Sequence, residues 1–98
     1  MSIVYKKDKF YESYKVIANI RKNQLREGTG SSVMCNIKDH KVRSKNGSST
    51  ICNIKNGDVR KANGSSRIAK IKDIRKEIKN SESVSDEFMA AIWYFFIN

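Results

Sequence analysis

The sequence predicts a mainly β (α+β) fold, an antiparallel β-meander of 17-residue hairpin repeats packed against a C-terminal helix. Three observations support it: a repeat of constant length, an alternation of apolar and polar residues within each copy, and an apolar C-terminal segment. The full copies are 16–32, 33–49 and 50–66, and a fourth begins at 67 and breaks off. No residue is inserted between copies, so equivalent residues form columns.

Each copy begins with a strand-like alternation and ends in a polar Gly-Ser-Ser loop. The predicted buried face carries Ala18 and Ile20 with their equivalents, and the opposite face carries Ile17, Asn19 and Arg21 with theirs. The small column (Ala18, Cys35, Cys52, Ala69) suggests that another element crosses this face. A turn signal such as Asn56-Gly57 then leads to a second short strand, so we predict one hairpin per copy. A small β-solenoid with one coil per copy is the alternative.

The chain is expected to form a single domain, 1–98, with a capping segment at each end of the repeats. Residues 1–15 match a shortened copy, with Phe10 at the position of Leu25, and predict a capping hairpin. The β-repeats are expected over 16–72 and a helical segment over 73–98. Ser83 or Ser85 can cap a helix that runs through the apolar end of the chain. We expect this helix to lie across the buried face of the sheet, because an isolated small sheet is unstable with both faces in water.

The formal net charge is +10, and it is unevenly distributed. All 20 Lys and Arg lie in residues 1–80, and residues 81–98 contain three carboxylates and no basic side chain. A basic body of this kind favours nucleic acid, acidic proteins or anionic surfaces. The longest apolar run, Phe88–Ile97, is too short to span a bilayer, and no signal peptide is recognisable. We therefore predict a cytoplasmic protein that does not act at a membrane, which also suits its two cysteines.

Two cationic columns are the candidate binding residues. Stacked like charges repel one another, so the cationic columns do not stabilise the fold. The alternative is a solvated, aggregation-resistant face. No aromatic residue is interleaved with the columns, so we expect contacts to phosphates rather than base stacking. The predicted polyanion-binding residues are Arg21, Lys38, Lys55 and Lys72 in one column and Arg26, Arg43 and Arg60 in the other.

No residue pattern indicates catalysis, a cofactor or a metal site. Cys35 and Cys52 share a column with alanines, which indicates core packing. These two cysteines and the single His40 are too few for a structural zinc site. The asparagine column (Asn19, Asn36, Asn53) is expected to hydrogen-bond along its own ladder and fix the register. We therefore predict that the protein is not an enzyme.

The IxNI, VR and GSS elements of the repeats, together with the terminal AAIWYFFIN, resemble a group of small bacterial repeat proteins. In that group, short β-repeats end in a Trp-containing apolar segment. The resemblance covers residues 16–98 and implies an architecture but no activity. By size and charge alone, the chain is also similar to prophage-encoded antagonists of host defence.

The leading functional prediction is a non-enzymatic binding module whose basic sheet face docks nucleic acid or a nucleoprotein complex. The alternative is a structural or oligomeric protein that acts through protein–protein contacts. In that case, a homodimer would bury the apolar C-terminal segment.

Overall fold

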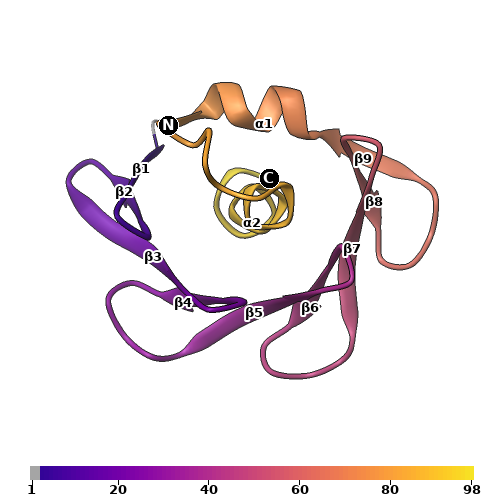
Figure 1. Cartoon of the computed structure of the whole chain (residues 1–98), viewed down its shortest axis with the longest axis horizontal. Helices are drawn as coiled ribbons and strands as arrows, with labels where there is room; N and C mark the ends of the chain where they lie inside the picture. The colour runs from indigo at the N-terminus through magenta and orange to yellow at the C-terminus, as the bar shows by residue number, and fades with distance from the viewer. Residues whose placement is uncertain (1–2) are drawn as a thin grey trace.

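The computed structural model describes residues 3–98 and shows a ten-stranded sheet curled around a central helix (Figure 1). Each full copy contributes one hairpin, as predicted. The strands are β1 (Ile3–Lys6), β2 (Lys9–Glu12), β3 (Lys15–Arg21), β4 (Gln24–Glu27), β5 (Val33–Lys38), β6 (Lys41–Ser44), β7 (Thr50–Lys55), β8 (Asp58–Lys61), β9 (Arg67–Lys70) and β10 (Ile78–Lys79). The helices are α1 (Ile71–Glu77), α2 (Asp86–Ile92) and the π-helical turn η1 (Trp93–Ile97).

The strand order is β10-β1-β2-β3-β4-β5-β6-β7-β8-β9, so β1 to β9 form a continuous antiparallel meander. This confirms the meander and excludes the one-coil-per-copy solenoid. Consecutive hairpins meet at a register irregularity, which falls between Phe10 and Tyr11, Leu25 and Arg26, Val42 and Arg43, and Val59 and Arg60. Because a bulge increases local twist and bends a strand, its regular recurrence helps the sheet to curl.

Tight two-residue turns close the hairpins. Asn56 and Gly57 have φ of 54° and 77°, which confirms the type I′ geometry expected for Asn-Gly. Asp39 and His40, at the same place in the preceding copy, have φ of 53° and 63°. The same turn conformation thus occurs in two copies and does not depend on glycine, whereas in the first copy only Lys22 of the turn has a positive φ, of 57°.

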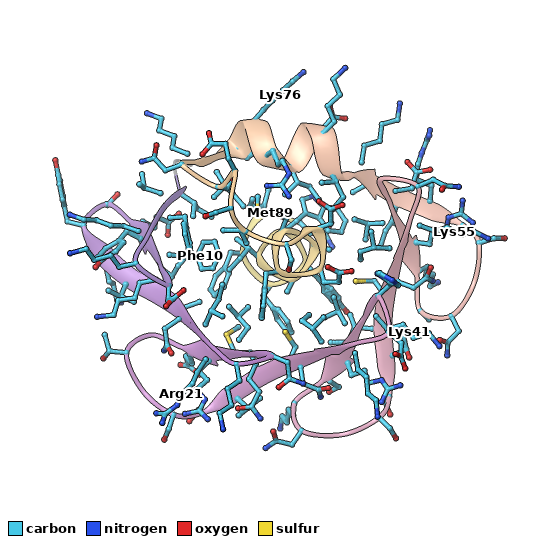
Figure 2. All side chains as sticks on the ribbon, viewed as in Figure 1. Phe10, Arg21, Lys41, Lys55, Lys76 and Met89 are labelled. Atoms are coloured by element: carbon cyan, nitrogen blue, oxygen red, sulfur yellow. The ribbon has the colours of Figure 1, made fainter. Side chains whose placement is uncertain are left out.

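The inner face of the sheet forms the core together with α2. Alternate residues of the strands point inward and have no exposed surface: Ala18, Leu25, Cys35, Val42, Cys52 and Val59. Helix α2 packs against β5, β6 and β7, and its residues Met89, Ala90, Ala91 and Ile92 are also fully buried. Figure 2 shows Phe10 and Met89 inside the ring and Arg21 and Lys55 outside it. The small column thus faces the helix, where little room remains.

Helix α2 lies on the buried face of the sheet, as expected, and packs against β5, β6 and β7. The helix is also surrounded, since the sheet curves around it (Figure 1), which the sequence analysis does not predict. Its all-round apolar surface accounts for this, because a ring buries every side of the helix whereas a flat sheet buries one. Ser85 caps the helix, as its side chain accepts a hydrogen bond from the backbone N–H of Phe88 at 3.4 Å.

The N-terminal hairpin β1–β2 repeats the inner pattern of the full copies. Phe10 is fully buried and lies opposite Ala18, just as Leu25 lies opposite Cys35. The sequence alignment of Phe10 with Leu25 is therefore confirmed.

The broken fourth copy behaves differently from the others. After β9 the chain forms α1, whose Ile71 and Ile74 are buried, and then β10, which pairs in parallel with β1. Helix α1 spans the gap between the two ends of the sheet (Figure 1). Arg75 fixes the following turn by donating to the carbonyls of Ser81 and Val84 at 2.6 and 2.8 Å. The ring is completed by a helix and not by strand pairing.

Candidate functional site

The outer face of the sheet presents a regular row of cations. Arg21, Lys38 and Lys55 are exposed and occupy the last positions of β3, β5 and β7. Alternation along each strand places them outside, since Ala18, Cys35 and Cys52 point inward. The strands that carry them are separated by one intervening strand, so neighbouring members lie about 10 Å apart.

The N-terminal hairpin adds a fourth member that the sequence prediction did not include. Lys6 pairs with Lys9 at the end of β1, as Arg21 pairs with Gln24 at the end of β3. Lys6 is exposed. The alignment of Phe10 with Leu25 contains this signal, because the same offset places Lys6 on Arg21. We call Lys6, Arg21, Lys38 and Lys55 the cation row.

Lys72, the fourth predicted member of this column, is not part of the row. The structure places it in α1, outside the sheet, although it is exposed. Ile71 matches the isoleucine at the fifth position of each copy. The spacing of Ile71, Ile74 and Ile78 also matches one face of a helix. In the structure a helix begins at Ile71.

The second predicted column, Arg26, Arg43 and Arg60, also faces outward but is only half exposed. We call it the arginine row. Arg26 donates to Oε1 of Gln24 at 2.9 Å through one terminal nitrogen. The Nε atoms of Arg43 and Arg60 are buried and have no hydrogen-bond partner in the described chain. These arginines therefore offer their terminal nitrogens to a ligand more readily than their whole guanidinium groups.

The asparagine column explains why the arginine row is partly covered. Asn36 lies opposite Arg43 on the outer face and donates to the carbonyls of Lys45 and Gly47 at 2.7 and 3.1 Å. Asn19 and Asn53 bind the corresponding carbonyls of their own copies. The predicted asparagine-to-asparagine ladder is therefore wrong, since equivalent strands are too far apart. Each asparagine instead holds the loop of its own repeat near the outer face.

Within residues 3–98 no member of either row forms an ion pair, although Asp58 lies opposite Lys55 in the strand register. The close basic–acidic contacts within residues 3–98 are the ion pairs Arg75–Asp86 at 2.7 Å and Lys76–Asp73 at 4.0 Å, and the hydrogen-bonded pair His40–Glu87 at 2.9 Å. All three involve α1, α2 or the turn that touches α2. The positive charge of the outer face is therefore available to an external anion.

A hollow of about 500 Å³ lies on the outside of the N-terminal hairpin. Its walls are mainly apolar, with one row member at its side. The lining residues are Val4, Lys6, Tyr11, Ser13 and Tyr14. Tyr11 follows Phe10 in the N-terminal hairpin as Arg26 follows Leu25 in the first full copy. Tyr11 therefore occupies the position that an arginine occupies in each full copy, ahead of Arg26 at the start of the arginine row.

The two thiols are poorly suited to nucleophilic chemistry. Cys35 and Cys52 are free and have no exposed surface. Burial raises the pKa of Cys35 to about 12, with a further contribution from Cys52, and raises the pKa of Cys52 to about 11. Within residues 3–98 no three His, Cys, Asp or Glu side chains gather in a way that could hold a metal ion.

No family model matches the sequence, and comparisons with curated proteins and with solved structures found no match. Among the residues described, no helix has the length and apolar character needed to cross a membrane. The functional argument therefore depends on the outer face itself.

Proposed function

We propose that the chain is a non-enzymatic binding module whose convex basic face docks nucleic acid or a nucleoprotein complex. The observation that carries the proposal is the cation row: exposed, evenly spaced and without a carboxylate partner. Evenly spaced cations are complementary to the evenly spaced phosphates of a nucleic-acid backbone.

Protection against aggregation explains this row less well. Charged residues guard the free edges of a sheet, where backbone groups are unpaired. β3, β5 and β7, however, are each hydrogen-bonded to a strand on both sides, and the sheet ends at β9 and β10. Arg21, Lys38 and Lys55 therefore lie where no edge needs protection.

The test is binding of labelled, random-sequence nucleic acid, single-stranded and duplex, measured by fluorescence anisotropy at several salt concentrations. The triple variant Arg21→Glu, Lys38→Glu and Lys55→Glu should weaken binding and lower the salt slope by about one for each lost phosphate contact.

The matched control reverses three exposed lysines outside the cation row, with Lys72→Glu, Lys76→Glu and Lys79→Glu. Both triple variants change the net charge equally, so only the location of the charge differs between them. Binding that falls equally in the two variants, or no binding at low salt, would refute docking at the cation row.

Self-association is a second candidate, and it rests on the aromatic end of the chain. Tyr94 and Phe95 in η1 are 39% and 37% exposed, and their ring centroids are 5.2 Å apart. Sedimentation of the wild type and of the Tyr94→Ser, Phe95→Ser double variant tests it. A wild-type dimer that the double variant dissociates would support this candidate, and a monomeric wild type would remove it.

A further inference from the structure

The hollow on the N-terminal hairpin exists because that hairpin lacks an element found in the full copies. A two-residue turn, Ser13–Tyr14, joins β2 to β3, whereas five residues, 28–32, join β4 to β5. Val4 occupies the outer position that corresponds to Asn19, and so no asparagine is present there to hold a loop. The surface that a loop approaches in the other copies is therefore open in this one.

One aromatic residue of the hollow, Tyr14, is exposed although the fold does not require an aromatic side chain there. Tyr14 is fully exposed, at 101% of its reference area, and Tyr11 is half buried beside Val4. An exposed tyrosine next to apolar walls offers a flat surface on which a ring can stack. The size of the hollow is within the range of small-ligand sites.

The hollow lies at the start of both rows. Lys6 lines it and is also the first member of the cation row, and Tyr11 takes the first place of the arginine row. A chain of phosphates that follows the cation row from Lys55 back to Lys6 is thereby led to the hollow. Backbone contacts and a stacking surface are thus combined along one path, which is how proteins bind single-stranded nucleic acids.

The curvature of the outer face decides between a duplex and a single strand. The cation row passes from β1 on one side of the ring, around the outside, to β7 on the other side (Figure 1). The ring measures 36 by 28 Å across its two longer axes. Duplex DNA has a persistence length of about 500 Å and cannot follow so tight a convex path without a large bending cost. A single strand is flexible enough to follow it.

We propose that the ligand of the outer face is a single-stranded nucleic acid, which follows the cation row and stacks a base on Tyr11 and Tyr14 in the hollow. This inference rests on the proposed function, because it requires that the outer face bind nucleic acid at all. It differs from the sequence expectation of phosphate contacts without base stacking, since the aromatic residues stand at the end of the rows and are not interleaved with them.

The first experiment compares three probes at low salt by fluorescence anisotropy. They are an oligothymidine of about ten nucleotides, a mixed-sequence duplex of the same length, and an abasic oligomer with the same phosphates. The oligothymidine should bind most tightly. The duplex and the abasic oligomer should both bind at least severalfold more weakly, because one cannot follow the row and the other cannot stack.

The second experiment removes the stacking surface. Tyr14→Ala should weaken oligothymidine binding by about tenfold, within the range found for loss of one stacked base, and should leave the abasic oligomer unaffected. Tyr14→Phe keeps the ring and should restore binding. Ile68→Ala is the matched control, because it removes another exposed apolar side chain, on a strand that carries no member of either row. Thermal unfolding of each variant confirms that the fold is retained.

The outcomes separate this inference from the proposed function. If no probe binds at low salt, the proposed function fails, and this inference fails with it. If all three probes bind equally and Tyr14→Ala has no effect, while the triple variant of the cation row still weakens binding, only the inference is overturned. A duplex that binds more tightly than the single strand would likewise overturn it.

Discussion

The N-terminal hairpin and the full copies present the same kind of side chain to the inside of the ring and different ones to the outside. Inside, Phe10 occupies the place of Leu25, Val42 and Val59, and all four are fully buried. Outside, Val4 and Tyr11 replace an asparagine and an arginine. The comparison teaches that packing around α2 constrains the inner columns, whereas the outer columns can change without altering the fold.

The largest expected effect comes from removing the helix that both regions enclose. Truncation before Phe88 should leave residues 1–87 unfolded or insoluble, because the inner face of every hairpin loses the helix that fills the ring. Far-UV circular dichroism and size-exclusion chromatography check this. A soluble fragment that unfolds cooperatively would mean that the ring is stable without its centre.

Single core truncations test whether the two regions share one core. Phe10→Ala in the N-terminal hairpin and Leu25→Ala in the first full copy should each lower the free energy of unfolding by about 3 kcal/mol, since both side chains are fully buried. Urea unfolding measures both, with Tyr14→Ala as the exposed control. A cost for Phe10→Ala below about 1 kcal/mol would indicate that the N-terminal hairpin contributes little to the core.

A moderate effect is expected on the outer face of the full copies. Asn36→Ala removes two hydrogen bonds to the loop of its own repeat and should cost about 1–2 kcal/mol of unfolding free energy. Asn63→Ala, at an exposed loop position of the next copy, should change stability by less than about 0.5 kcal/mol. Equal effects in urea unfolding would show that the asparagine column does not hold the loops.

The thiols of the inner face have no expected effect at neutral pH, because their contribution changes only at high pH. Their pKa values in the folded protein, about 12 for Cys35 and about 11 for Cys52, lie above the usual value of 9.0. The unfolded chain therefore loses these protons first, so their contribution to stability is intact below pH 9 and declines as the pH rises toward 12. The Cys35→Ala, Cys52→Ala variant should lose less stability over this interval in urea unfolding. An unchanged pH dependence would mean that the thiols ionise equally in both states.

The sequence predicts well the features that depend on one set of equivalent repeat positions. The alternation of the repeats predicts the buried positions and the placement of Phe10, and the Asn-Gly pair predicts the turn at Asn56-Gly57. Outside the repeats, the sequence offers Ser83 or Ser85 as the helix cap, and the structure selects Ser85. The same columns predict Arg21, Lys38 and Lys55 on the outer face, where the structure places them.

Features that depend on how the whole sheet curves were not predictable from columns. Sequence alternation does not report curvature. It therefore predicts the helix on the buried face, but not the ring around that helix or the convex path of the cation row. The contacts of Asn36 depend on the folded loop, which no column describes. Ile71 suits a strand and a helix equally well, and only the need to span the open side of the ring favours the helix.

The helix at the centre of the ring also limits how many repeats the protein can carry. In an open linear array, an added repeat extends the stack and increases its stability. Here, one more hairpin would lengthen the circumference by about 10 Å and the radius by about 1.5 Å. A gap of that size around α2 would remove much of its dispersion contact with the sheet. Duplicating residues 33–49 adds a hairpin that is identical to a native one. It should nevertheless destabilise the protein, because the diameter of a single helix limits the number of copies that can surround it.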